Sequence, residues 1–392
     1  MKKYLNILVY LVYFSTPFES VGVGHGISVV KIITAFVLIF ALFNLKVFKI
    51  PKIRFFLFFL AYMIWTIFSS LWSIDPAITL RYSLGMILPT FLSTIVIFNL
   101  IHSKKQIENI FKSYALGSII VSIIALYMFA TGFRFANELD YARVTVLGQD
   151  QNELSFLLSF GIVSIIYLLK FTKQKRGVKF VFFASTFVLA FTVLSTGSRT
   201  GFVILLTIVT VVIIMLIKKG RIVYFLPIIV GAGILMYMYL PGMVTNRLFQ
   251  TTQQIKTENL TGRVVIWQMG WSAFNQEKAY LFGTGFHAFR ELMNSYYQWP
   301  KAPHNTYLST MIGLGIIGFL IYSVMIICLL QKVFFLVKNH SQYFILLILP
   351  LLLAMFTLGL ETRRWLYLLA VLIIRIFQLL RAEDAKKQIS MN

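Results

Sequence analysis

The chain has 392 residues, of which 59% are hydrophobic and only 12% are charged, and its mean hydropathy is +0.82. Soluble domains carry about twice that share of charged residues, so the composition excludes an ordinary soluble domain and indicates a membrane protein. The formal net charge of +23 does not by itself indicate a nucleic-acid partner, because multi-pass membrane proteins collect Lys and Arg in their cytoplasmic loops. We therefore expect no nucleic acid among the partners. The single cysteine, Cys328, excludes an intrachain disulfide and a thiolate metal site.

Apolar windows of about twenty residues recur along the whole chain and predict about twelve transmembrane helices. They lie near residues 4–22, 27–47, 54–73, 79–101, 110–131, 152–171, 179–196, 201–217, 222–240, 306–330, 342–358 and 365–381. The first window follows two lysines, as the apolar part of a signal peptide does, but no small-residue cleavage pattern follows it, so we predict a retained span. The expected fold is all-α and polytopic, with residues 1–392 forming one transmembrane domain.

Alternate connections between these windows are basic, which predicts their side of the membrane. Lysines and arginines gather around residues 46–54, 104–105, 173–179, 218–221 and 332–338. The positive-inside rule places these connections, and both termini, in the cytoplasm. The longest connection on the opposite face, residues 241–305 before the tenth helix, is then a large periplasmic loop.

Two stretches of this loop carry apolar residues at helical spacing. The first stretch contains Val244, Leu248, Thr251 and Ile255, and the second contains Val264, Trp267, Trp271 and Phe274. This spacing predicts two amphipathic helices that lie along the outer face of the membrane.

The outward face is rich in arginine and poor in lysine. With this topology, only three of the 22 lysines are clearly outward, whereas nine of the 14 arginines are: Arg81, Arg134, Arg143, Arg199, Arg247, Arg263, Arg290, Arg363 and Arg364. A guanidinium group presents a planar fork that matches phosphate oxygens, whereas an ammonium group is a more strongly hydrated point charge. The bias therefore favours a phosphate-bearing substrate outside the membrane. The alternative is a set of unrelated arginines that snorkel to the interface.

Two of these arginines lie in segments suited to holding an anion. The turn Ser195–Gly201 contains glycines that let the chain reverse, and it holds Arg199 at the mouth of the membrane. Arg263 follows Gly262 in the first turn of a predicted helix, where free backbone N–H groups also favour an anion.

The segment Pro303–Leu308 offers a candidate general base. It precedes an apolar run, so Asn305 or Thr306 can cap the helix that follows. The positive end of the helix dipole disfavours an imidazolium ion, so we expect His304 to be neutral and able to accept a proton. A structural histidine in a loop is the alternative interpretation.

Taken in order, these segments resemble the motifs of the O-antigen ligase and O-antigen polymerase family. The motifs are Ser198-Arg199-Thr200-Gly201, Gly262-Arg263 with Trp267, Gly283-Thr284-Gly285 with Phe289, Pro303-His304-Asn305-Thr306-Tyr307-Leu308 and Gly315-Ile316-Ile317-Gly318. Upstream, Arg143–Gly148 with Asn152 resembles a further outward motif, except that Gln151 stands where the family usually has proline. The resemblance covers roughly residues 140–330.

The resemblance implies a metal-independent glycosyltransferase of the GT-C type, without a cofactor. Such an enzyme moves a glycan from undecaprenyl pyrophosphate to an acceptor sugar on the outer face of the cytoplasmic membrane, in the biosynthesis of lipopolysaccharide or another surface polysaccharide. Arg199 and Arg263 would stabilise the pyrophosphate leaving group, and His304 would deprotonate the acceptor hydroxyl. The further substrate-binding candidates are Arg143, Asn152, Asn305, Arg363 and Arg364. The expected partners are the undecaprenyl-linked donor, a lipid- or glycan-linked acceptor and membrane lipid.

Other classes of protein stay open at this point. A metal-dependent polyprenyl-phosphate-sugar transferase would need an outward acidic pair, for which Glu138-Leu139-Asp140 has the spacing. A transporter or flippase for lipid-linked glycans would suit twelve spans, although no half-repeat is detectable. Within the resembled family, both ligase and polymerase remain compatible with the motifs.

Overall fold

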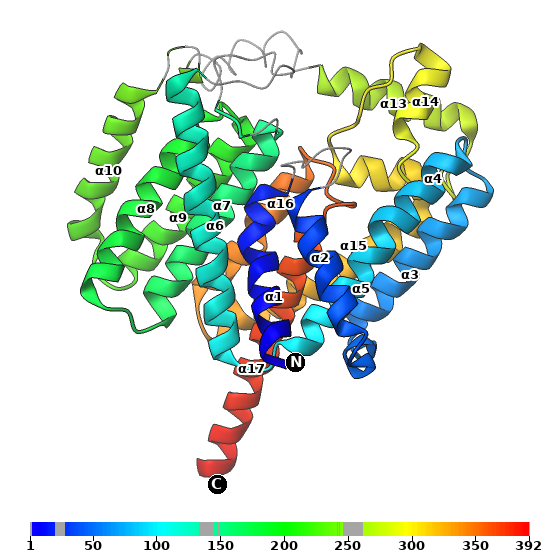
Figure 1. Ribbon diagram of the computed structural model, residues 1–392. Coiled ribbons are helices and arrows are strands. Elements are labelled where there is room, and N and C mark those ends of the chain that lie inside the picture. Colours follow the sequence, from blue (N-terminus) through cyan, green and yellow to red (C-terminus); the bar gives the residue numbers. More distant parts are fainter. Residues whose placement is uncertain are drawn as a thin grey trace. The chain divides into compact units, whose positions relative to one another are not determined.

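The computed structural model describes residues 2–19, 28–132, 144–146, 149–240, 242, 244–245 and 262–391 (Figure 1). These residues form helices joined by turns, and they contain no β-strand element. Nine of the described helices are long and apolar enough to cross a membrane, and three shorter apolar helices accompany them. Each of the twelve predicted windows overlaps one of these helices, which confirms the all-α, multi-pass membrane class.

Contacts divide the chain into two compact units, each assembled from separate stretches. The first unit comprises Met1–Phe40, Ile101–Thr251 and Leu336–Pro350. The second comprises Ala41–Leu100, Thr252–Phe335 and Leu351–Asn392.

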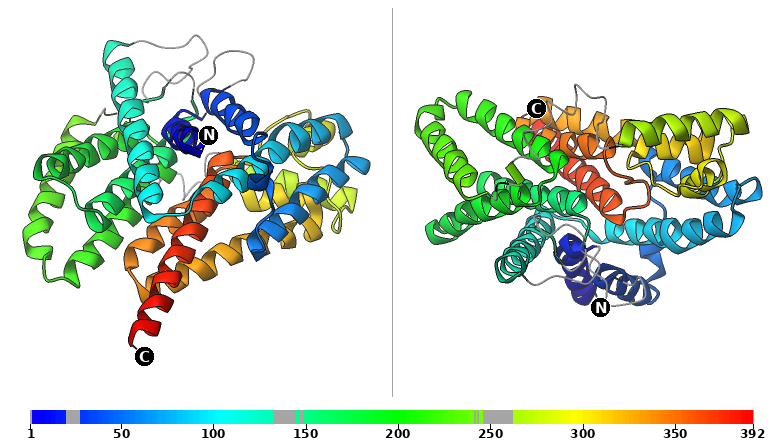
Figure 2. Two further views of the ribbon diagram at one scale, coloured as in Figure 1. Left: turned by 60° about the horizontal axis from the view of Figure 1, so that its bottom comes forward. Right: turned by 90° about the horizontal axis from the view of Figure 1, so that it is seen from above.

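The first unit is a helical bundle built around α7. Its helices are α1 (Lys2–Ser15), α2 (Val29–Ala41), α6 (Lys104–Thr131), α7 (Gln151–Phe171), α8 (Arg176–Ser195), α9 (Arg199–Ile217), α10 (Ile222–Tyr239) and the short η5 (Gln342–Leu347). Helix α7 packs against α6, α8 and α9, and the neighbouring helices α8, α9 and α10 lie side by side (Figures 1 and 2). A Cβ atom on Gly161 of α7 would lie 2.6 Å from Ser118, so glycine permits the close approach of α6 and α7.

The second unit contains α13, one of the two predicted outward helices, and the C-terminal span. Its elements are α3 (Arg54–Phe68), η3 (Ser69–Leu71), α4 (Pro76–Tyr82), the π-helical η4 (Ser83–Ile87), α5 (Leu88–Leu100), α13 (Arg263–Glu277), α14 (Phe289–Tyr297), most of α15 (Thr306–Asn339), most of α16 (Leu349–Met355) and α17 (Arg364–Met391). Helices α13 and α14 lie beside each other (Figures 1 and 2).

Helix α15 is broken at Gly315, where φ is 64° and ψ is −172°. The break frees carbonyl groups of the preceding turn, and the loop before α14 uses them. The backbone N–H of Thr284 donates to the carbonyl of Ile312 at 2.9 Å, and that of Gly285 donates to Gly313 at 2.9 Å. In return, the N–H of Ile316 donates to the carbonyl of Tyr280 at 2.8 Å. Backbone polar groups released inside this apolar helix are thus satisfied within the protein.

The glycines of two motifs make this junction possible. A Cβ atom on Gly283 would lie 2.4 Å from the carbonyl oxygen of Gly313, and one on Gly315 would lie 2.3 Å from that of Leu281. Both glycines also have positive φ angles, which side-chain-bearing residues rarely adopt. These motif residues therefore position backbone segments.

The predicted helix around residues 264–274 forms as α13, but the face that is buried within the protein only partly matches the predicted apolar stripe. Its buried residues are Ile266, Gly270, Ala273 and Phe274, whereas Trp271 is 42% exposed. The buried face is set by packing against Phe289, Leu292 and Met293 of α14 and Ile312 of α15, which spacing within one segment does not reveal. The companion helix predicted around residues 244–255 falls largely outside the described residues.

Candidate functional site

In the first unit, Arg199 is fixed at the start of α9 by a capping network. Ser198 is the N-cap residue, and its hydroxyl accepts the backbone N–H of Gly201 at 3.1 Å. The same hydroxyl donates to the side-chain oxygen of Asn152 at 2.8 Å. The structure thus brings Asn152 beside the residue that precedes Arg199. The Arg199 side chain itself is only partly buried.

The segment around Val144 joins the same group of residues. The N–H of Val144 donates to the carbonyl of Ser195 at 3.0 Å, so this segment lies against the turn that leads to Arg199. The predicted substrate-binding residue Arg143 lies outside the described residues.

The unusual Gln151 has a simple structural explanation. It is the first residue of α7, where the Asp150 side chain caps the helix by accepting the N–H groups of Asn152 and Glu153. Proline is favoured at the first helical position because its missing N–H would have no partner there in any case. Replacing proline by Gln151 therefore leaves the helix start, and with it the position of Asn152, in place.

In the second unit, hydrogen bonds brace the chain on both sides of His304. The carbonyl of Pro303 accepts the indole N–H of Trp267 at 2.7 Å. The side chain of Asn305 caps α15 by accepting the N–H of Leu308 at 3.1 Å. Asn305 is therefore the helix cap, one of the two alternatives that the sequence leaves open.

Thr306 has a different role from capping. Its hydroxyl donates to the carbonyl of Leu358 at 2.7 Å and accepts the N–H of Leu360 at 2.9 Å. These two bonds tie the start of α15 to the segment that carries Arg363 and Arg364.

His304 itself has an exposed side chain on this braced backbone. Its φ angle is 45°, in the left-handed region that few residues other than glycine adopt. Such strained conformations persist when the surroundings fix them, and they are frequent at functional sites. The three residues Pro303, Asn305 and Thr306 supply that fixation here.

Arg263 lies on the same face of α13 as Trp267. The two residues are four positions apart, one helical turn, so their side chains are neighbours on the helix surface. Because Trp267 contacts Pro303, this face of α13 is turned toward the segment that presents His304. The structure therefore links the helix that carries Arg263, through Trp267, to the segment that carries His304 and Asn305.

The segment that leads from α16 into α17 contributes both predicted arginines and a buried carboxyl group. Arg364 is 7% exposed and begins α17, while Arg363 is partly buried. Between this segment and α15, the Ser309 hydroxyl donates to Oε1 of Glu361 at 2.6 Å. Burial raises the pKa of Glu361, although the Ser309 hydrogen bond and Arg363 act in the opposite direction. Sequence reasoning selected the arginine pair and missed Glu361, whose position two residues before Arg363 was the available signal.

A second missed residue is His287. Its ring centroid lies 3.7 Å from that of Tyr82, the last residue of α4. Burial, together with the neighbouring Arg290 and Arg363, lowers the pKa of His287 to about 4. Its imidazole is therefore neutral at physiological pH and lies close to two of the predicted outward arginines. The sequence gives a weak signal for this, since His287 lies two residues after the glycine motif Gly283-Thr284-Gly285.

A metal-binding cluster does not occur among the described residues, in which no group of three or more His, Cys, Asp or Glu side chains converges. The acidic pair Glu138 and Asp140, on which the metal-dependent alternative depends, lies outside the described residues.

The protein is thus a multi-pass, all-α membrane protein with two arginine-bearing groups of residues, one in each unit. Residues 184–323 match the family model described as O-antigen ligase. This match confirms the resemblance to the O-antigen ligase and polymerase family and supports an enzyme of the ligase or polymerase type, with lipid-linked glycan and acceptor as substrates. The matched region contains Arg199, Arg263 and His304. No curated protein matches the chain.

Proposed function

We propose that this protein is a metal-independent glycosyltransferase of the GT-C type that transfers a glycan from undecaprenyl pyrophosphate to an acceptor sugar. In this reaction the acceptor hydroxyl oxygen forms a bond to the anomeric carbon of the donor. The bond between that carbon and the pyrophosphate oxygen breaks, and the hydroxyl proton passes to a base. Undecaprenyl pyrophosphate is the leaving group.

The observation that carries the proposal is the presentation of His304 in a region that matches the O-antigen ligase family. Its side chain is exposed, its backbone is held by neighbours on both sides, and the helix linked to it through Trp267 carries Arg263. An exposed and well-positioned imidazole suits a base that must meet the hydroxyl of an arriving acceptor.

The arginines are assigned to the pyrophosphate. Arg199 begins α9 and Arg263 begins α13, and the start of a helix, with backbone N–H groups outside the helical ladder, also favours an anion. Positive charge aimed at the leaving group stabilises the negative charge that develops there. We assign supporting contacts with the substrate to Arg143, Asn152, Asn305, Arg363 and Arg364.

Substitution of arginine by lysine tests this assignment, because lysine keeps the charge but loses the planar fork. Arg199→Lys and Arg263→Lys are each expected to lose most transfer activity with purified lipid-linked donor. Arg54→Lys, at the exposed start of α3, is the matched control and should transfer at the wild-type rate. Near-normal turnover in both test variants, with normal membrane insertion, would refute the assignment.

The location is proposed to be the cytoplasmic membrane, with His304 and the arginines on its outer face. Cysteines introduced at Lys278 and Lys105, in a background that lacks Cys328, test this orientation. An impermeant thiol reagent applied to cells whose outer membrane, if present, has been permeabilised should label the first position and miss the second. The reverse labelling would place the site in the cytoplasm and would contradict a reaction at the outer face of the membrane.

A further inference from the structure

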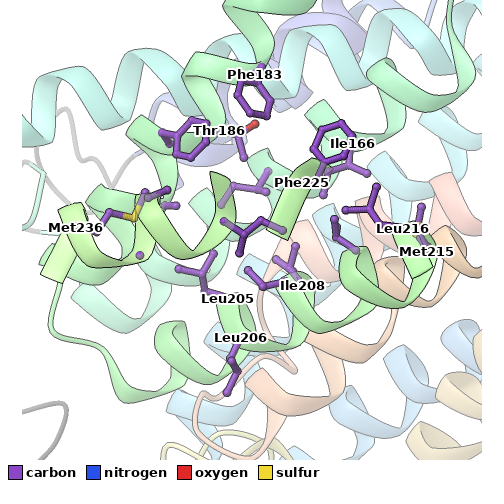
Figure 3. Close-up of a pocket in the computed structure, with 18 of the residues that line it drawn as sticks. Ile166, Phe183, Thr186, Leu205, Leu206, Ile208, Met215, Leu216, Phe225 and Met236 are labelled. Atoms are coloured by element: carbon purple, nitrogen blue, oxygen red, sulfur yellow. The ribbon is translucent and has the colours of Figure 1, made fainter. Parts of the chain in front are cut away.

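A large apolar cavity lies within the first unit, apart from the residues discussed so far. Its volume is about 760 Å³, inside the range of about 300–1,000 Å³ typical of ligand sites. Phe183 from α8, Ile208 from α9 and Phe225 from α10 line the same space (Figure 3). No residue of α10 is buried, so this wall of the cavity lies at the surface of the bundle, next to the surrounding lipid.

Three cationic side chains line the same cavity at one end. Lys170 is the next-to-last residue of α7, Lys219 follows the end of α9, and Arg221 directly precedes α10. The ion pairs found in the described part of the chain involve other lysines, so no carboxylate there neutralises these three cations.

This cationic end is remote from the candidate donor site of the same unit. Asn152 and Ser198 are hydrogen-bonded at the start of α7 and α9, and the three cations lie where these two helices end. Helix α9 has 19 residues and is therefore about 28 Å long, close to the thickness of the hydrocarbon core. The cations thus lie near one membrane surface, and Arg199 near the other.

An apolar chamber with cations at one end is complementary to an amphiphile with hydrocarbon chains and an anionic headgroup. Basic pockets between transmembrane helices on the cytoplasmic side bind such headgroups. The lysine-rich connections 173–179 and 218–221 predict that the cationic end faces the cytoplasm. A polyprenyl donor that places its pyrophosphate near Arg199 would have its headgroup at the opposite end.

We propose that this cavity binds an anionic phospholipid of the cytoplasmic leaflet. Its acyl chain lies among α8, α9 and α10, and its phosphate contacts Lys170, Lys219 and Arg221. This site is separate from the glycan-transfer site and does not depend on the proposed function.

The cavity offers two pairs of matched substitutions. Lys219 lines the cavity, whereas the adjacent Lys218 does not, so Lys219→Gln and Lys218→Gln change the same charge at neighbouring positions. Gly233 lines the cavity and Gly231 does not, although a Cβ atom at either position meets nothing within 4 Å. Gly233→Phe therefore fills the cavity, and Gly231→Phe adds the same ring elsewhere on α10.

Native mass spectrometry of the full-length protein in detergent measures the binding directly. The probes are phosphatidylglycerol, phosphatidylcholine with the same acyl chains, a polyprenyl monophosphate and inorganic phosphate. Phosphatidylglycerol should bind at least tenfold more tightly than phosphatidylcholine, because each basic residue contributes through the headgroup charge. Lys219→Gln should weaken binding about fivefold and Gly233→Phe should abolish most of it, while both controls bind as the wild type does.

Several outcomes would overturn the proposal. Equal binding of the two phospholipids would show that the cations do not contribute to binding. An equal loss of phosphatidylglycerol affinity in Lys219→Gln and Lys218→Gln would show the same. Displacement of phosphatidylglycerol by inorganic phosphate would indicate a free-anion site. Preferential binding of the polyprenyl phosphate would assign the cavity to an isoprenoid. Thermal unfolding of each variant separates lost binding from lost folding, and the lysine pair tests the proposal even if Gly233→Phe fails to fold.

Discussion

Trp267 donates its indole N–H to the carbonyl of Pro303 across 2.7 Å, and this bond links the helix that carries Arg263 to the residue before His304. From the sequence alone, Trp267 would be assigned only to the membrane interface, whereas the structure gives it a hydrogen bond that connects two segments. It also suggests that the positions of the arginine and the histidine are coupled.

Trp267→Phe is expected to reduce transfer ten- to hundredfold while leaving donor binding nearly unchanged. The substitution keeps a large aromatic ring but removes the hydrogen bond, and a small displacement of a catalytic group has about this effect on rate. Single-turnover transfer and donor binding, measured on the same preparation, give the two values. Trp271→Phe serves as the control because Trp271 is 42% exposed on the same helix. A wild-type transfer rate in Trp267→Phe would show that the bond does not position His304.

Gly315→Ala is expected to destabilise the protein by about 3 kcal/mol or more. The backbone conformation at Gly315 is nearly exclusive to glycine, and the new methyl group would lie 2.3 Å from the carbonyl oxygen of Leu281. Thermal or denaturant unfolding in detergent measures the loss. Gly85→Ala, where a Cβ atom meets nothing within 4 Å, should have little effect. Equal stability of the two variants would contradict the account of the broken helix.

His287 predicts a specific loss of stability in acid. The unfolded chain takes up a proton near pH 6.5, whereas the folded state keeps this imidazole neutral down to about pH 4. The free energy of unfolding therefore decreases as the pH falls from about 6.5 to about 4. Outside this window the contribution of His287 to that free energy does not change with pH. The difference in pKa corresponds to about 3 kcal/mol at the acid end.

His287→Gln should remove this part of the pH dependence. Unfolding in detergent between pH 7.5 and pH 4 is the measurement, and the wild type should lose more stability over that range than the variant. Parallel curves for the two proteins would mean that His287 takes up its proton equally in the folded and unfolded states.

The positions of the membrane helices could be predicted from the sequence because they depend on local hydropathy alone. The same holds for a helix cap at Asn305 or Thr306 and for Arg263 at a helix start, since a few adjacent residues determine these features.

Features that depend on distant segments could not be predicted in this way. The break at Gly315 lies inside a continuous apolar run, and its stabilising partners come from residues 280–285, which hydropathy does not connect to it. The buried face of α13 is determined by α14, so the spacing of apolar residues within α13 misplaced it. The hydrogen bond between Ser309 and Glu361 joins residues 52 positions apart, so the sequence alone does not indicate that Glu361 lies beside α15.

The role of His304 as general base is tested most directly by single-turnover transfer in His304→Ala. A base acts after the donor has bound, so the variant should bind donor lipid with nearly wild-type affinity and retain its melting temperature while transfer slows about a hundredfold or more. A chelator should leave the wild-type rate unchanged, since the proposed step uses no metal. Transfer by His304→Ala at the wild-type rate would contradict the account, and so would a lost rate accompanied by collapsed thermal stability, which would identify His304 as a structural residue.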